Sequence, residues 1–227
     1  DLAETPFSGQ QFSLKQPAVN MQEVVGSHDL LFVCLDTLRY DVAKAEETAQ
    51  RTPVLNQYGP WEKRQAPGNF TYPSHHAMFA GFLPLPDESK TMLERELLFF
   101  PRSVGLGQQV PAGAYGYDAP TFVQALAEEG YLTICIGGVS FFDKRSALGS
   151  VFPAMFTQSY WQPGFGCQVK DSTERQIRFA LTRLARVPQT RRVMMYLNID
   201  AIHYPNYFYL EDERQDNLRT HAAALRY

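Results

Sequence analysis

Three predominantly apolar runs alternate with helix-like segments along the chain. The runs cover 30–35, 131–136 and 193–199, and each has the length of a strand. Continuous apolar runs are typical of strands that are covered on both faces of a parallel sheet. Apolar residues at helical spacing lie between and after these runs, over 42–50, 121–130, 171–187 and 211–225. This alternation predicts an α/β fold, a doubly wound and mostly parallel sheet with helices on both faces.

The other segments divide the 227 residues into an extension, one domain and an insertion. Residues 1–28 are polar without a sustained period, so we expect an N-terminal extension on the surface. Residues 29–227 are expected to form the α/β domain. Within it, residues 84–120 hold five prolines besides four glycines, which indicates an irregular insertion. A long connection inside a compact domain is either functional or a surface excursion, and both alternatives remain open.

The segment 67–81 predicts a turn that presents a side chain at the start of a helix. Pro73 suits a first helical turn and keeps Tyr72 in extended geometry. Thr71 is therefore expected just outside the helix N-terminus, where unpaired backbone N–H groups and the helix dipole favour an anion. The alternative is an ordinary junction in which Thr71 caps the helix.

Acidic residues follow two of the apolar runs directly. Asp36 ends the first run, and Asp200 ends the third, with His203 close behind. In open α/β sheets the ligand crevice lies at the carboxyl ends of the strands, although Asp36 can equally cap the next helix. A divalent cation held by Asp36 would lower the pKa of Thr71, which predicts metal-assisted ester hydrolysis. Carboxylate and histidine ligands suit zinc or manganese, and calcium is a further candidate.

The composition limits which classes of binding partner are expected. The net charge of −3 and the lack of a basic block argue against nucleic acid. Cys34, Cys135 and Cys167 show no metal-type spacing, so we expect reduced thiols in a cytoplasmic protein. No apolar run is long enough to span a bilayer. The expected partner is a small anionic ester, and the oligomeric state does not follow from the sequence.

Four motifs, in the correct order, resemble those of the alkaline phosphatase superfamily, which includes sulfatases and nucleotide phosphodiesterases. The stretch 35–41, LDTLRYD, is similar to the first metal-binding strand end. The stretch 71–75, TYPSH, followed by Gly81, is similar to the nucleophile motif. Residues 126–137 resemble the sulfatase stretch before its lysine and histidine, and 203–205, HYP, resembles the sulfatase His-x-Pro element.

This resemblance implies a metal-dependent hydrolase of phosphate or sulfate esters. In phosphodiesterase-like members the position of Thr71 holds the attacking threonine, whereas in sulfatases it holds a cysteine that becomes formylglycine. The threonine therefore favours phosphate-type esters. His75 is implied to lie beside the transferred group and to take part in catalysis, and Asn69 and His203 are implied to bind the substrate.

The same resemblance implies a metal site formed by Asp36, Thr71 and Asp200. Thr37 stands where the family has the second of two paired aspartates. A later Asp-His-Gly metal motif is expected near residue 225 and is absent from the sequence. The chain is thus either part of a longer enzyme or a sulfatase-like binding or scaffold protein without catalysis. A serine hydrolase is a weaker third alternative, because Ser74 does not lie in a Gly-x-Ser-x-Gly elbow.

Overall fold

The computed structural model describes residues 19–68, 70–82, 98–99, 115–116 and 119–227. The predicted insertion lies almost wholly outside these residues, as do residues 1–18 of the predicted extension. Within the part of the chain that is described, no helix combines the length and the apolar character needed to cross a membrane.

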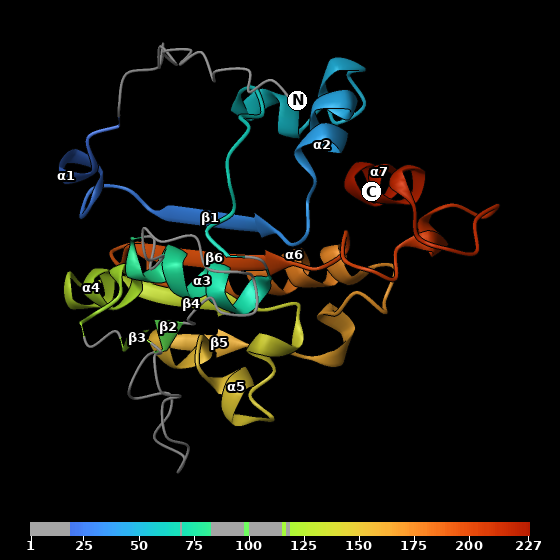
Figure 1. The fold of residues 1–227 in the computed structure, drawn as a ribbon. Coiled ribbons are helices and arrows are strands. Elements are labelled where there is room, and N and C mark those ends of the chain that lie inside the picture. The colour runs from blue at the N-terminus through green and yellow to red at the C-terminus, as the bar shows by residue number, and fades with distance from the viewer. Residues whose placement is uncertain (1–18, 69, 83–97, 100–114, 117–118) are drawn as a thin grey trace, which may run out of the picture.

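A four-stranded, all-parallel sheet forms the centre of the structure (Figure 1). Its strands are β1 (Leu30–Leu35), β4 (Leu132–Ile136), β5 (Gln158–Tyr160) and β6 (Val193–Ile199), in the order β1-β6-β4-β5. A separate parallel pair joins β2 (Leu98–Phe99) to β3 (Tyr115–Gly116). The three apolar runs are thus confirmed as strands. The pattern missed β5, because three residues that include a glutamine and a serine give no apolar run.

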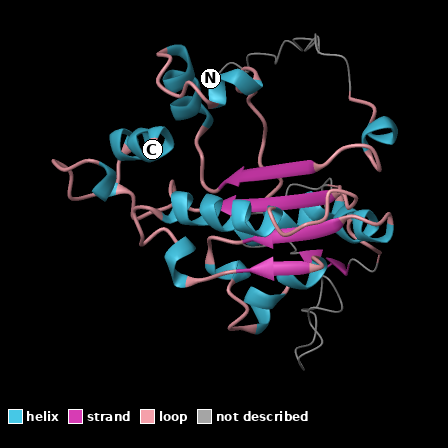
Figure 2. Ribbon diagram, turned by 180° about the vertical axis from the view of Figure 1, so that it is seen from behind, coloured by secondary structure: helices cyan, strands magenta, loops and turns pink. Residues whose placement is uncertain are grey.

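Helices cover both faces of this sheet, which confirms the predicted fold class. Figure 1 shows α3 in front of the strands, with α4 beside the start of β4, and Figure 2, drawn from behind, shows α6 on the opposite face. The described helices are α1 (Met21–Val24), α2 (Tyr40–Thr48), α3 (Thr71–Ala80), α4 (Phe122–Glu128), α5 (Ala147–Ser150), α6 (Ser172–Leu184) and α7 (Leu218–Arg226).

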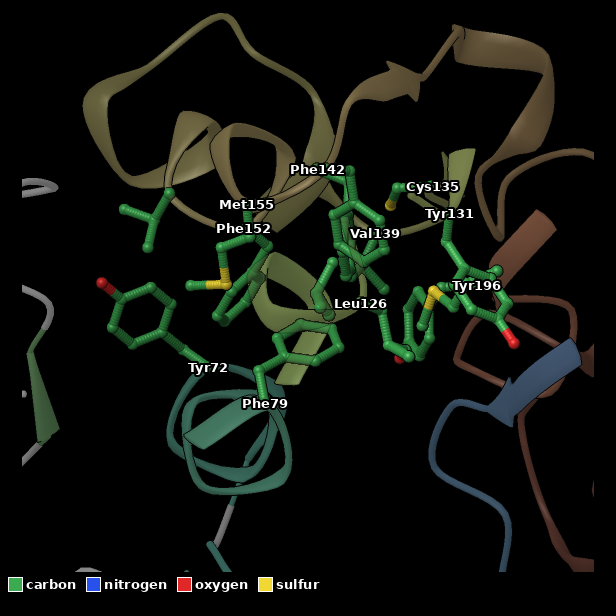
Figure 3. Close-up of a cluster of buried hydrophobic side chains, with 14 residues drawn as sticks. Tyr72, Phe79, Leu126, Tyr131, Cys135, Val139, Phe142, Phe152, Met155 and Tyr196 are labelled. Atoms are coloured by element: carbon green, nitrogen blue, oxygen red, sulfur yellow. The ribbon is translucent and has the colours of Figure 1, made fainter. Parts of the chain in front are cut away.

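Alternate residues of the central strands feed two separate cores. Tyr196 of β6 faces α3, and its ring packs with Phe79 of α3 and with Phe142 in an aromatic cluster (Figure 3). The ring centroids of Phe79 and Tyr196 lie 5.2 Å apart, close to the edge-to-face arrangement that aromatic pairs prefer. The neighbouring residue Met195 faces the other way and packs with Ala180 of α6. This alternation fixes which side chains reach each face.

The prediction that every apolar run is covered on both faces is wrong for β1. This strand lies at the edge of the sheet and pairs only with β6 among the described residues. Leu31 and Val33 are 65% and 51% exposed, whereas all residues of β4 and β6 are buried. The apolar run specifies a strand, but it does not specify how many neighbours the strand has.

The last helix is shorter than its pattern predicts. α7 begins at Leu218, because the Asn217 side chain accepts hydrogen bonds from the backbone N–H groups of Arg219 and Thr220 and starts the helix there. The Asp171 side chain does not cap α6. Its carboxylate instead accepts a hydrogen bond from Arg175 at 2.9 Å.

Candidate functional site

The helix predicted within residues 67–81 forms, but it starts earlier than expected, because Tyr72 is helical and not extended as predicted. Thr71 is the first residue of α3 and not the residue before it, and Phe70 is the extended N-cap residue. Pro73 lies in the first turn, where its missing N–H leaves no helical hydrogen bond unmade. Gly81 ends the helix in the left-handed region at φ 82°, a conformation that favours glycine. The Thr71 hydroxyl is thus fixed at the positive end of a ten-residue helix.

The predicted pair of Thr71 and Asp36 is brought together. The Thr71 Oγ1 lies 3.4 Å from Oδ1 and 3.4 Å from Oδ2 of Asp36, so the hydroxyl faces the whole carboxylate. Asp36 continues the ladder of β1, since its backbone N–H donates to the Ile199 carbonyl oxygen at 2.9 Å. The strand end and the helix start therefore place the acid and the hydroxyl against each other.

Asn198 fixes the Asp36 carboxylate, and sequence reasoning missed it. Its side-chain N–H donates to Asp36 Oδ2 at 3.0 Å. Its Oδ1 accepts from the backbone N–H groups of Gly138 and Val139 at 3.2 and 3.1 Å. The Asn198 side chain is fully buried, so it joins the ends of β1, β6 and the loop after β4 away from water. The available signal was an amide inside an otherwise apolar run.

The surroundings of Asp36 fit a cation. Asp36 is 6% exposed, and it forms no ion pair with the residues that the structure describes. A buried carboxylate is costly unless it is paired or bound to a metal. Carboxylate and hydroxyl oxygens are the donors that hard divalent cations take. Asp36 and Thr71 are thus a suitable pair of ligands for the metal that the sequence predicts.

His75, expected beside the transferred group, is a buried residue of α3. Its Nδ1 is 2.7 Å from the Thr71 carbonyl oxygen, and its Nε2 is 2.5 Å from the Tyr196 hydroxyl. A carbonyl oxygen only accepts, so Nδ1 carries the proton and Nε2 accepts from Tyr196. Burial lowers the pKa of His75, which keeps the ring neutral in this role. Both ring nitrogens are therefore occupied within the fold.

Asp200 groups with His203, as expected, and with Cys167, which the sequence did not indicate. The Cys167 backbone N–H donates to Asp200 Oδ2 at 2.8 Å. One potential ligand atom from each of the three residues lies within 4.8 Å of the other two. Of the expected metal set, Asp36 and Thr71 lie together, and Asp200 lies with Cys167 and His203.

The Asp200 carboxyl is electrostatically unfavourable in its charged form. Its pKa is raised to about 7, chiefly by burial and also by the negative charge of Asp36, against the opposing effects of His203 and the Cys167 N–H. Its Oδ1 is buried and has no hydrogen-bond partner among the described residues. Asp200 therefore has one satisfied and one unsatisfied oxygen, and its carboxylate belongs to the group that contains the Cys167 and His203 side chains.

The chain is similar to a known protein in structure but not in sequence. No protein-family model and no curated protein matches the sequence. The lipoteichoic acid synthase LtaP from Listeria monocytogenes matches in structure with a TM-score of 0.54 over 88% of this chain, at 15% sequence identity. The chain has an alkaline phosphatase-like fold.

This finding confirms the fold-level resemblance that the four motifs predict. The chain covers 48% of LtaP, about half of its length. An identity of 15% shows a common fold, and it assigns no substrate and no residue role to this chain. The predicted roles of Thr71 and Asp36 therefore depend on their own geometry. Asn69, predicted to bind the substrate, lies outside the described residues.

Proposed function

We propose that this chain carries the nucleophile of a metal-dependent hydrolase of phosphate or sulfate esters. The observation that supports this function best is the position of the Thr71 hydroxyl, 3.4 Å from both oxygens of the buried Asp36 carboxylate. Thr71 also starts α3, so the positive end of the helix dipole faces an anion bound there. The likeness to LtaP supports the framework of such an enzyme.

Asp36 and Thr71 are the residues that would hold the metal. When bound, a divalent cation would lower the pKa of the threonine hydroxyl and reduce the negative charge of the ester. Asn198 contributes by fixing one Asp36 oxygen at 3.0 Å, which leaves the rest of the carboxylate facing Thr71. A carboxylate that is already oriented needs no rearrangement when the nucleophile becomes charged.

Thr71 performs the covalent step in this proposal. Its Oγ1 loses its proton towards Asp36 and forms a bond with the phosphorus or sulfur of the ester. The bond to the alcohol breaks, and the alcohol oxygen leaves with the bonding electrons and takes up the proton that Asp36 accepted. Water then attacks the ester on Thr71, which releases the inorganic anion and restores the hydroxyl. His75 keeps the Thr71 backbone in place through the 2.7 Å hydrogen bond to its carbonyl oxygen.

Hydrolysis of an aryl phosphate and an aryl sulfate tests the assignment. Thr71→Ala should abolish turnover, because it removes the attacking hydroxyl and one of the two proposed metal ligands, and Thr71→Ser should keep measurable turnover, because it keeps the hydroxyl. Thr48→Ala is the matched control, since that threonine is exposed on α2 and its hydroxyl donates to a carbonyl of its own helix. Unchanged turnover in Thr71→Ala would exclude Thr71 as the nucleophile.

The second candidate function is anion binding without turnover. It is favoured by one observation: among the described residues, Asp36 is the only carboxylate that accepts a hydrogen bond from Thr71. A single acid is a small ligand set for a catalytic metal. Calorimetric titration with phosphate and sulfate separates the two functions. Binding that Thr71→Ala weakens, in a protein that turns over neither ester, would support the binding protein over the enzyme.

A further inference from the structure

We propose that Cys167, Asp200 and His203 form a second metal site, separate from the pair of Asp36 and Thr71, and that this site takes zinc. The site goes beyond the proposed hydrolase and does not depend on it. One potential ligand atom from each of the three residues lies within 4.8 Å of the other two. Two ligand atoms on one tetrahedral zinc ion are roughly 3.3–3.7 Å apart, so movements of about 1 Å complete the site. Cys167 and His203 are only partly buried, which leaves room for such movements.

The local chain geometry assembles these ligands. Asp200 follows β6 directly, and the His203 backbone N–H donates to the Asp200 carbonyl oxygen at 3.1 Å, which closes a tight turn. Cys167 comes from the loop after the short helix Pro163–Phe165, and the 2.8 Å hydrogen bond from its N–H holds it against Asp200. The three ligands thus come from two loops that are already fixed to each other.

Asp200 supplies an observation that itself points to a ligand. The residue is 2% exposed, and its Oδ1 has no hydrogen-bond partner among the described residues. Oδ2 is occupied by the Cys167 N–H, so Oδ1 is the oxygen that remains for a ligand. An unsatisfied buried carboxylate oxygen costs free energy, and a cation removes this cost.

The orientation of His203 also suits metal binding. Its Nδ1 lies 2.8 Å from the Tyr204 carbonyl oxygen, which can only accept, so Nδ1 carries the proton. The lone pair is therefore on Nε2. A histidine that binds a metal through one nitrogen commonly donates the other N–H to a carbonyl in this way.

The donor set indicates the kind of metal. One thiolate, one imidazole and one carboxylate form a mixed set that zinc accepts, whereas magnesium and calcium prefer oxygen alone. Three protein ligands leave a fourth tetrahedral position open, which is the arrangement of zinc sites that bind a water molecule or a substrate. The thiol must lose its proton to bind, so occupancy should increase with pH.

Cobalt substitution tests this site without any measurement of activity. The purified protein is treated with a chelator and titrated with Co²⁺, and the near-ultraviolet charge-transfer band of a cobalt-thiolate bond is recorded. We expect one band in the wild type, which zinc removes by displacement. Cys167→Ser should abolish it, and Cys135→Ala should retain it, because Cys135 is buried in the core.

Zinc affinity gives the second measurement. Cys167→Ser and His203→Ala should each weaken zinc binding by more than the roughly 10- to 100-fold that loss of an outer-shell partner costs. In the wild type, zinc should protect Cys167 from alkylation, which is read by mass spectrometry and needs no variant. Absence of the band, its survival in Cys167→Ser, or unprotected alkylation would each overturn the second site. Zinc bound without a thiolate band, and with activity that depends on Thr71, would overturn this site and leave the proposed hydrolase standing.

Discussion

Removing the Asn198 side chain should destabilise the fold and release Asp36 at the same time. The side chain is fully buried and makes three hydrogen bonds, one to Asp36 and two from the N–H groups of Gly138 and Val139. In Asn198→Ala both N–H groups are left buried without this acceptor. Two such donors at about 1–3 kcal/mol each lower the free energy of unfolding by roughly 2–6 kcal/mol. Many native proteins are stable by only about 5–15 kcal/mol, so the loss is a large share of the total.

Urea unfolding measures this loss. With a slope of about 3 kcal/mol per molar urea, the expected loss lowers the midpoint by roughly 0.7–2 M. Gln57→Ala is the control, because this exposed amide lies on the surface and should leave the midpoint unchanged. Turnover or anion binding at Thr71 should fall in Asn198→Ala even where the protein remains folded. A loss of less than about 1 kcal/mol would refute the assignment of Asn198 as the residue that joins the strand ends.

Asn198→Asp removes the hydrogen-bond donor to Asp36 but keeps a side chain of similar shape, so it separates the effect of the donor from that of the whole side chain. The new carboxylate still accepts from both N–H groups, but it faces Asp36 where the amide donated. Two adjacent carboxylates raise the pKa of one of them in the folded state, so the folded state binds more protons than the unfolded state. The variant should therefore be destabilised at pH 7 and should regain stability relative to the wild type as the pH falls towards 4. A penalty that is independent of pH would contradict this account.

Two further predictions concern buried groups near the site. Acid should destabilise the protein through His76, because burial lowers its pKa from 6.5 to about 3, so the unfolded state binds the proton first as the pH falls below 6.5. The loss should reach about 2 kcal/mol at pH 5, and in urea unfolding at pH 5 and pH 8 His76→Phe should lack it. Gly138→Ala should cost about 1–3 kcal/mol, because the added Cβ would lie 2.6 Å from the Asn198 carbonyl oxygen and from Asp200 Cβ. Gly166→Ala, whose added Cβ meets nothing nearer than 3.7 Å, should leave the urea midpoint unchanged, and equal losses in both variants would contradict the steric reason.

The central strands could be predicted because their environment is simple. β4 and β6 have neighbours on both edges and helices on both faces, so every residue is buried and every position favours an apolar side chain. β1 has the same apolar character, and the prediction that both of its faces are covered is wrong. Local composition reports which segments become strands, whereas the number of neighbours is set by distant parts of the chain. β5 was missed for the converse reason, since its edge position leaves it partly buried and its residues are mixed.

Site residues could be predicted only where their position next to a strand or a helix in the sequence is enough to place them. Asp36 follows a strand and Thr71 begins a helix, and both positions can be predicted from the local sequence pattern. Asn198 and Cys167 have no such signal. Asn198 lies inside an apolar run, and its function depends on two N–H groups about 60 residues earlier in the chain. Cys167 is an isolated cysteine that reaches the site only because its loop folds onto the end of β6.

The register of β1 and β6 explains why two acidic groups form at one edge of the sheet. Leu35 pairs with Ile199, so the next residue of each strand, Asp36 and Asp200, ends its strand at the same level. The two buried carboxylates repel each other, which contributes to the raised pKa of Asp200. The structure gives them different partners: Asp36 faces the Thr71 hydroxyl, and Asp200 lies against Cys167. A cation bound to each of the two neighbouring carboxylates would remove the repulsion between their negative charges. The same pair of strand ends that supports the proposed ester chemistry thus also favours a second, thiolate-containing metal site beside it.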